Sequence, residues 1–366
     1  MADPNDEDDA PPQLSRRKLL ALINSGGVAS IAGCSDRPPE DTTSEISTEP
    51  TDTGQTETAT SAQTSTDTEY RPPAPLSVDN TNPYVYINDQ NDNFNAELTL
   101  AMASRGYIDL RGFVFGYAGE PWLRPEQFES RRRDYESHHS TVHEKAIESG
   151  FENLPPAETG VVGGRHERPE TGVIEDTEPI GSTGTDRIVE EARNASRDDP
   201  LVLAVGCDLC TVADAYLRDP SIAERLVVFI NWTGSAEQPG YNIVQSGWSA
   251  SIVLEELSAV LVGGNSPLVK RDQVMALPDV PLKEFMLSKE HFKFGNLLED
   301  GRRSDGDSTA VLSAAHPDVR AATRSVRVTG QTDPHFEADF QIPKLAYGAG
   351  TENLKGITEA TGFTRA

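Results

Sequence analysis

Residues 83–98 read Pro-Tyr-Val-Tyr-Ile-Asn-Asp-Gln-Asn-Asp-Asn-Phe-Asn-Ala-Glu-Leu. An apolar run typical of a buried strand, Tyr84–Ile87, passes into a cluster of carboxylates and amides and then into the apolar pattern of a helix near Asn95–Ser104. We call residues 88–95 the Asp/Asn box. Its polar side chains offer only oxygen ligands, which Ca²⁺ prefers, but Asn and Asp are also favoured in turns and helix caps. The box therefore predicts either a site for a hard cation or water, or a capped turn.

Strand-like and helical segments alternate after the box. The expected strands are Ile108–Phe115, Leu201–Val205 and Leu226–Ile230, and the expected helices lie near Pro125–Ser149, Asp186–Ser196 and Thr211–Leu217. Such alternation indicates parallel βαβ units, so the sequence predicts an α/β fold with an open, mostly parallel sheet flanked by helices. Ligands of such sheets bind beyond the carboxyl ends of the strands, where the box and residues 206–211 both lie.

The later part of the chain is less regular. Helices are expected at Ser246–Leu261 and Ser308–Ala315, and strands at Ser325–Thr329 and His335–Ile342 are expected to form a terminal hairpin. The Gly- and Glu-rich stretch after Ser149 is expected to be a loop. No internal repeat is visible, and the sequence predicts one large domain over residues 76–366.

The N-terminal residues 1–34 have the form of a targeting segment. Ser15-Arg16-Arg17-Lys18-Leu19-Leu20 is a twin-arginine signal, and the weakly apolar stretch after it is too short to span a bilayer. Ile31-Ala32-Gly33-Cys34 has the form of a lipobox, in which Cys34 becomes the lipidated first residue of the mature chain. We therefore expect export by the twin-arginine route and lipid anchoring on the outer face of the cell membrane.

Residues 35–75 consist mainly of Thr, Ser, Glu, Asp and Pro. Such a segment buries too little apolar surface to offset its ordering entropy, so we expect a disordered stalk between the lipid and the domain.

The charge balance limits the kinds of partner. The chain has 59 acidic and 32 basic residues, a net charge of −27, which opposes binding to nucleic acid. An acidic excess of this kind favours the surface of a salt-loving organism, and an ordinary acidic protein with an acidic stalk is the alternative.

Cys207 and Cys210 form a Cys-Asp-Leu-Cys pair. A disulfide or redox motif is one interpretation, but two small, partly buried thiols are favoured, because free Cys behaves mostly as a small hydrophobic residue. No second pair of this spacing exists, so a zinc site is not indicated.

A second candidate metal pair lies in His138-His139-Ser-Thr-Val-His143, where His139 and His143 share a helix face. The Glu of the metalloprotease motif is missing after the first His of this pair, so we expect a solvated helix face instead.

Four segments in order carry a family resemblance. They are the Asp/Asn box, Val205-Gly-Cys-Asp-Leu-Cys-Thr-Val-Ala213 with Asp219-Pro-Ser-Ile-Ala-Glu-Arg225, Tyr241-Asn-Ile-Val-Gln-Ser-Gly-Trp248, and Ser304-Asp-Gly-Asp-Ser308 with His316-Pro-Asp318. The series resembles the inosine/uridine-preferring nucleoside hydrolase family over about Tyr84 to Ile342.

The resemblance implies a calcium-dependent hydrolase of N-glycosidic bonds that acts on a nucleoside or related sugar. It implies metal ligands at Asp89, Asp92, Asn95, the Gly206 carbonyl and Asp307, with Asp89 or Asp92 taking a proton from the attacking water. Asn242 and Asn95 would contact the sugar. A homo-oligomer is an open alternative to a monomer.

The departures from the family pattern fall on the same positions. A gap-free frame puts Asn88, Gln90, Phe94 and Asn95 at the four carboxylate positions of the box. Glycine replaces other expected side chains, at Gly240 for a Glu, at Gly306 for a His, and at Gly119 near a sugar-binding Asn. A second hypothesis is therefore a surface lipoprotein that binds a nucleoside or sugar without catalysis.

Overall fold

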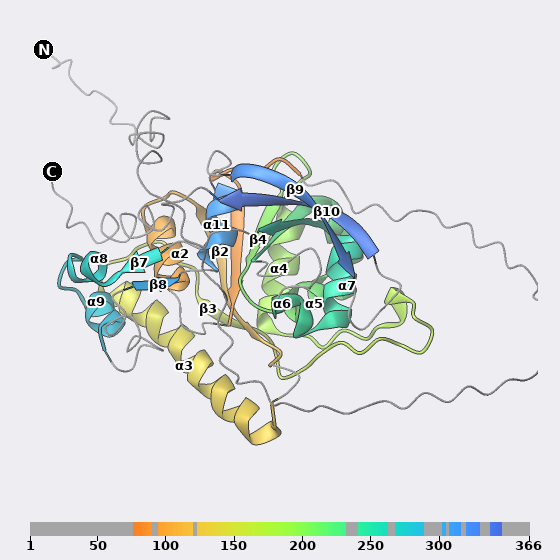
Figure 1. Ribbon diagram of the computed structural model, residues 1–366, viewed down its shortest axis with the longest axis horizontal. Coiled ribbons are helices and arrows are strands. Elements are labelled where there is room, and N and C mark those ends of the chain that lie inside the picture. The colour runs from red at the N-terminus through yellow and green to blue at the C-terminus, as the bar shows by residue number, and fades with distance from the viewer. Residues whose placement is uncertain are drawn as a thin grey trace, which may run out of the picture. The chain divides into compact units, whose positions relative to one another are not determined.

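The computed structural model describes residues 76–89, 94–119, 123–231, 241–262, 268–288, 302–304, 307–315, 320–329 and 337–345 (Figure 1). Contacts divide the chain into residues 1–69 and 70–366, and every described residue belongs to the second unit. The expected segments 1–34, with Cys34, and 35–75 lie outside the described residues and stay predictions. Within the described ranges, no helix combines the length and the apolar character needed to cross a bilayer.

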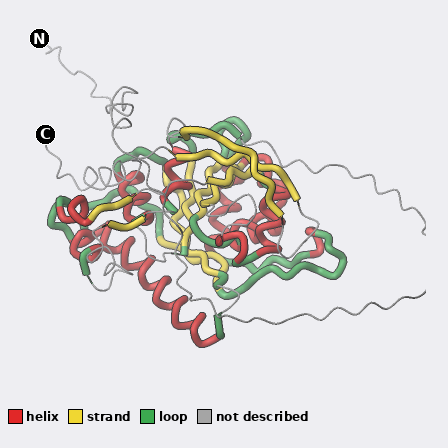
Figure 2. The backbone as a smooth tube through the Cα atoms, viewed as in Figure 1, coloured by secondary structure: helices red, strands yellow, loops and turns green. Residues whose placement is uncertain are grey.

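A parallel sheet forms the centre of the fold (Figure 2). Its six strands, in the order β3-β2-β1-β4-β5-β6, are β1 (Pro83–Asn88), β2 (Asp109–Tyr117), β3 (Ala157–Val162), β4 (Leu201–Val205), β5 (Leu226–Asn231) and β6 (Ser258–Val262). Every pairing between them is parallel. Strands of such sheets are covered on both faces, which explains the continuous apolar runs in the sequence. The predicted fold class is confirmed.

Helices cover both faces of the sheet (Figure 1). One group contacts strands β2 to β6 and consists of α2 (Asn95–Ser104), α3 (Pro125–Glu148) and α11 (Ser308–Ala315). The other group consists of α4 (Thr183–Asn194), α5 (Cys210–Arg218) and α7 (Gly247–Glu256). The result is a three-layer α/β/α arrangement.

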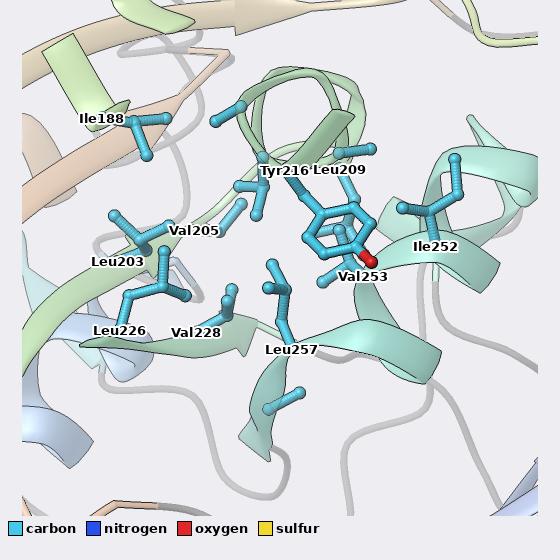
Figure 3. Packing of buried hydrophobic residues seen from close by; sticks show 14 of the residues in the cluster. Ile188, Leu203, Val205, Leu209, Tyr216, Leu226, Val228, Ile252, Val253 and Leu257 are labelled. Carbon is cyan, nitrogen blue, oxygen red and sulfur yellow. The ribbon is translucent and has the colours of Figure 1, made fainter. Parts of the chain in front are cut away.

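The two faces have different cores. On the side of α4, α5 and α7 the core is mainly aliphatic, and Figure 3 shows Leu203 and Val228 of the sheet among side chains from those helices, such as Ile188 and Val253. On the other face aromatic rings dominate: Tyr86 stacks on Phe113 with ring centroids 5.7 Å apart. Because helices bury both faces, a site has to lie at the ends of the strands.

Two predictions of secondary structure are wrong. Ser246–Leu261 is not one helix, because α7 ends at Glu256 and Ser258–Val262 pairs with β5 as strand β6. The whole stretch is apolar, and a continuous apolar run does not distinguish a buried helix from a buried strand. The expected loop after Ser149 contains β3, an edge strand that pairs only with β2 and is therefore less apolar than the inner strands.

The last described residues form an antiparallel hairpin of β9 (Arg320–Thr329) and β10 (Glu337–Leu345), which confirms the predicted hairpin, and β10 contacts β6. The remaining described elements are short: η1 (Ile174–Asp176), η2 (Pro220–Arg225), α6 (Tyr241–Val244), β7 (Leu268–Lys270), α8 (Arg271–Met275), α9 (Pro281–Met286) and β8 (Arg302–Ser304). None of them extends the central sheet.

The strand order reverses between β1 and β4. From β1 the chain proceeds outward through β2 and β3, and from β4 it proceeds in the other direction through β5 and β6. Ligands of open α/β sheets bind at such a reversal, beyond the carboxyl ends of the strands. The ends of β1 and β4 are joined there by a hydrogen bond of 2.9 Å from the Gly206 amide to the Ile87 carbonyl.

Candidate functional site

Gly206 lies where β4 ends at the strand reversal, and its neighbours leave no room for a side chain. A Cβ atom at this position would lie 2.7 Å from Asp307 Cβ and 3.0 Å from Asn88 Oδ1. Real Cβ contacts do not occur at the shorter of these distances. The glycine therefore lets the start of α11 approach the ends of β1 and β4.

Asp307 directly precedes α11 and is buried. Its Oδ2 atom accepts a hydrogen bond of 3.0 Å from Asn95 Nδ2, at the start of α2. Its Oδ1 atom accepts a second hydrogen bond from the amide of Asn231, at the end of β5. Two buried amides from separate elements thus hold the two oxygens of this carboxylate.

A third amide holds the backbone of the same region. Asn242 Nδ2, on α6, donates to the Gly206 carbonyl at 3.2 Å and to the Asn231 carbonyl at 3.0 Å. We call the side chains of Asn95, Asn231, Asn242 and Asp307, with the Gly206 carbonyl, the amide cluster. Its members come from the ends of β4 and β5 and from the starts of α2 and α11, with α6 beside them.

The direction of these amides follows from their other contacts. Asn95 Oδ1 accepts from the Ala96 amide at 3.0 Å, and Asn231 Oδ1 accepts from Thr309 Oγ1 at 3.2 Å. Rotating the Asn95 amide by half a turn would set its oxygen against a carboxylate oxygen and its N–H₂ against the Ala96 amide, and rotating the Asn231 amide would set its oxygen against the other carboxylate oxygen. The amide nitrogens therefore face Asp307.

Asp89 follows β1 and is 1% exposed. Its backbone amide donates to Asn88 Oδ1 at 2.7 Å. Burial first, and then the charges of Asp208, Asp89 and Asp307, raise the pKa of the Cys207 thiol well above its ordinary value. The charges of Asp89, after β1, and of Asp307, before α11, thus both act on the Cys207 thiol.

Asp208 ties the end of β2 to the turn after β4. Its Oδ2 atom accepts from the Ala118 amide at 2.7 Å, and Oδ1 accepts from the Cys210 amide at 2.9 Å. Burial raises the pKa of this carboxyl, against the lowering effect of these hydrogen bonds and of the Arg165 charge. Both carboxylate oxygens accept backbone hydrogen bonds, so the role of Asp208 beside the candidate site is structural.

Gly119, which the resemblance places near a sugar-binding Asn, has a φ of +78°. A Cβ atom here would lie 2.4 Å from the ring of Phe128. The Gly119 carbonyl accepts a hydrogen bond from the Arg165 guanidinium. Neither the backbone conformation nor the space around it suits an amide side chain.

Cys207 and Cys210 are free and buried. The prediction of two thiols in place of a disulfide is confirmed, although the burial is complete and not partial. For Cys210 too, burial and then the charge of Asp208 raise the thiol pKa well above its ordinary value. Because protonated thiols are poor nucleophiles, this environment disfavours reaction at either cysteine.

The expected solvated face of the His-rich helix is wrong. His138 and His139 are buried in α3, and the His139 ring stacks on Phe113 of β2 with centroids 4.1 Å apart. His143 Nε2 hydrogen bonds to the Pro155 carbonyl at 2.7 Å. The rings of His139 and His143 both stack on Phe113, with centroids 4.1 Å and 5.7 Å away, so these histidines pack against the sheet like other ring side chains.

The long loop between β3 and α4 is held to α5 and α7 by side chains. His166 hydrogen bonds to Ser249 Oγ at 3.0 Å and to Asp214 Oδ1 at 3.2 Å. Trp248 Nε1 donates to Thr177 Oγ1 at 3.0 Å. These contacts hold part of the stretch that the sequence predicts to be a loop, and the side chain of His166 is fully buried.

The structure brings together Asn95, Gly206, Asn242 and Asp307, which the resemblance places in one site. Asp92, Gln90, Gly240 and Gly306 lie outside the described residues. The sequence did not single out Asn231. Its signal was an amide directly after the buried strand Leu226–Ile230, at the carboxyl end where ligands of parallel sheets bind.

The described residues do not fit the calcium ion that the resemblance implies. Ca²⁺ takes about 6–8 oxygen ligands, and its affinity rises with their charge. Both oxygens of Asp307 and the carbonyl of Gly206 hold amide N–H groups, which repel a cation. Nor do the described residues contain a group of three or more His, Cys, Asp or Glu side chains arranged for a metal.

The fold has counterparts among solved nucleoside hydrolases. An inosine-guanosine nucleoside hydrolase is 14% identical, with a TM-score of 0.52, over 77% of this chain and 100% of that one. The chain has the fold of nucleoside hydrolases. A plant nucleoside hydrolase matches at 11% identity and a TM-score of 0.50, over 76% of this chain and 98% of that one. A purine-preferring ribonucleoside hydrolase from Gardnerella vaginalis matches at 12% identity and a TM-score of 0.50, over 77% of this chain and 98% of that one.

Sequence comparison adds no nearer relative. No family model matches the chain. No curated protein matches it either. At identities of 14% or lower, the structural likeness concerns the fold, and function has to be argued from the site.

Proposed function

We propose that the protein binds a nucleoside or a related ribosyl compound at the carboxyl edge of the sheet, between β1 and β4. The observation that carries this proposal is the amide cluster, which gathers buried polar side chains at the strand reversal. Solved proteins of the same fold are named as nucleoside hydrolases, which supports the ligand class.

The chemistry of the cluster suits sugar hydroxyls. The amides of Asn95 and Asn231 each donate one N–H to Asp307 and have a second N–H, whereas Asn242 uses both of its N–H groups on carbonyls and offers its oxygen as an acceptor. A hydroxyl group both donates and accepts, so one hydroxyl can satisfy an amide and a carboxylate together. The site is buried, and hydrogen bonds formed there are stronger than in water.

Calorimetric titration of the full chain with inosine, adenosine, uridine and ribose tests this proposal. We expect saturable binding of at least one of them, and loss of binding in Asn242→Ala. The matched control is Asn82→Ala, which removes a buried amide before β1, at the opposite edge of the sheet. The proposal fails if no compound binds, or if Asn242→Ala and Asn82→Ala bind equally well.

Hydrolysis of the N-glycosidic bond is a second candidate function, and the buried carboxylate of Asp89 favours it. Asp89, or Asp92, would take the proton of an attacking water, and nearby negative charge would stabilise a sugar with oxocarbenium character. A bound Ca²⁺ would supply a more acidic water, but the described residues do not fit this ion, so no step is assigned to it.

The two functions are separated by following free base and free sugar over time, with Ca²⁺ and with a chelator. Release of base that Asp89→Asn abolishes would establish the hydrolase. Binding of an intact nucleoside with no release under either condition would leave the binding function alone.

We also propose that the protein acts outside the cytoplasm, exported by the twin-arginine signal and anchored through lipid at Cys34, with residues 35–75 as a stalk. The motif order at Ser15–Leu20 and Ile31–Cys34 supports this. Cys34→Ala is expected to move the protein from the membrane fraction to the medium. Retention of the variant in the membrane fraction would contradict the anchor.

A further inference from the structure

We infer that the amide cluster stands in for a divalent cation, so that the site is assembled without metal and one substitution, Asn95→Asp, creates a site for Ca²⁺. This inference deepens the proposed function because it concerns the same site, but it is tested without any nucleoside.

The first step concerns the charge of Asp307. Asp307 is 6% exposed, and its Cβ atom would lie 2.7 Å from a Cβ atom placed on Gly206. A buried carboxylate needs compensating partners, either a cation or several N–H donors. Here Asn95 and Asn231 supply donors to its two oxygens.

The second step concerns the Gly206 carbonyl, an oxygen that the resemblance counts among the metal ligands. It accepts from Asn242 Nδ2 at 3.2 Å, and the same amide reaches the Asn231 carbonyl at 3.0 Å. The carboxylate and the carbonyl that would face a cation thus face amide nitrogens. An amide presents the positive end of its dipole without adding net charge.

Asn95→Asp would add a second carboxylate beside Asp307. Asn95 Nδ2 and Asp307 Oδ2 are 3.0 Å apart, so Asn95→Asp would set two carboxylates against each other in a buried place. Like charges at that distance do not both ionise without a cation between them. Two carboxylates would supply oxygens of the kind that Ca²⁺ takes, and the Gly206 carbonyl would join them once Asn242 Nδ2 turns away from it.

The effect of divalent cations on stability is measured by thermal unfolding of the full chain. The unfolding is followed with a chelator, with millimolar Ca²⁺ and with millimolar Mg²⁺, at equal ionic strength. We expect the Tm of the wild type to be the same in all three. Asn95→Asp is expected to unfold at lower temperature with chelator and to regain about 5 °C or more with Ca²⁺.

The matched control is the exchange variant Asn95→Asp/Asp307→Asn. It has the net charge of the wild type, and the new amide at position 307 can accept from Asn231 and donate to the new carboxylate. The Ala96 amide can still donate to position 95, as it does to Asn95. We expect a Tm near that of the wild type and no response to Ca²⁺.

Three results would overturn the inference: a Tm of the wild type that rises by several degrees with Ca²⁺, an Asn95→Asp variant that Ca²⁺ leaves unchanged, or an exchange variant that responds as strongly as the single one. If Asn95→Asp does not fold under any condition, Asn231→Asp adds the carboxylate from β5, and its response to Ca²⁺ decides. Direct calorimetric titration of the wild type with Ca²⁺ is independent of any variant. No heat of binding supports the inference, and saturable binding overturns it.

Discussion

A hydrogen bond between an Asn amide and an Asp carboxylate lies at each end of the parallel strands. We call the side of their amino ends the amino edge of the sheet and the side of their carboxyl ends the carboxyl edge, and the surroundings of the two bonds differ strongly. At the amino edge, Asn82 donates to Asp199 at 2.9 Å, and Asp199 is exposed. At the carboxyl edge, Asn95 donates to Asp307 at 3.0 Å, and Asp307 is buried.

The difference separates a polar contact that joins two segments of the fold, at Asp199, from polar contacts that the fold does not require, at Asp307. Asn82 also reaches the Pro200 carbonyl, and one amide is enough to join the segments that enter β1 and β4, because water solvates Asp199. At the other edge Asp307 is removed from water and needs both Asn95 and Asn231. A concentration of buried polar groups at one edge is the mark of a site, since it costs stability that the fold alone does not require.

The largest effect expected from this contrast is on stability. Asp307→Ala would leave the amides of Asn95 and Asn231 without their charged acceptor in a buried place, and we expect a loss of about 3 kcal/mol or more in the free energy of unfolding. Asp199→Ala is the matched change at the amino edge, with an expected loss below about 1 kcal/mol. Urea unfolding measures both, and equal losses would break the comparison.

The next prediction concerns the pH dependence of stability that comes from His139, which packs on the face of the sheet and not at the candidate site. Burial first, and then the charge of His143, lower the pKa of His139 to about 3, against the opposing effect of the Phe113 carbonyl. The ring is neutral in the folded chain, while the unfolded chain binds a proton below about pH 6.5. Stability is therefore lost as pH falls from about 6.5 toward 3.

His139→Phe keeps a ring against Phe113 and removes this titration. Between pH 7 and pH 4 the wild type is expected to lose up to about 3 kcal/mol more than the variant. Urea unfolding at the two pH values gives the difference. Parallel pH profiles would mean that His139 is protonated or solvated in the folded state.

A smaller loss is expected from packing at the strand reversal. Gly206→Ala would place a Cβ atom 2.7 Å from Asp307 Cβ, and such overpacking costs about 1–3 kcal/mol. Gly116→Ala is the control on β2, where the nearest atom is 3.2 Å away and belongs to a side chain. A larger loss at Gly116 than at Gly206, by urea unfolding, would argue against the close approach of α11.

The smallest effect concerns the buried thiols beside the site. Because burial and nearby carboxylates raise the pKa values of Cys207 and Cys210, we expect no labelling by a thiol reagent at pH 8 until the chain is unfolded. Mass spectrometry after labelling with and without urea provides the measurement. Rapid labelling of either thiol in the folded chain would show that this edge opens to solvent.

Much of the fold could be predicted from local pattern. The helix near Asn95–Ser104 and the strand Leu201–Val205 have the expected bounds, because an apolar period or run is bordered there by polar residues. Strand β3 was missed at the edge of the sheet, where burial demands less apolar sequence. Strand β6 was taken for helix because its apolar run continues from α7 without a break.

The site could be predicted only in part. The resemblance placed Asn95 and Asp307 in one site, and the structure joins them across 212 residues of sequence. Local pattern carries no information on such a contact, nor on which way an amide points. Asn231, a single amide after a strand, became visible only through its hydrogen bond to Asp307. The roles of Asp89 and Asp92 stay predictions.

Titration of the wild-type full chain with inosine, adenosine and uridine in the presence of a chelator tests the central claim most directly. The claim is that a metal-free amide cluster at the carboxyl edge binds a nucleoside. We predict saturable heat of binding for at least one nucleoside, unchanged when Ca²⁺ replaces the chelator. Binding that requires Ca²⁺, or no binding of any nucleoside in either condition, would contradict it.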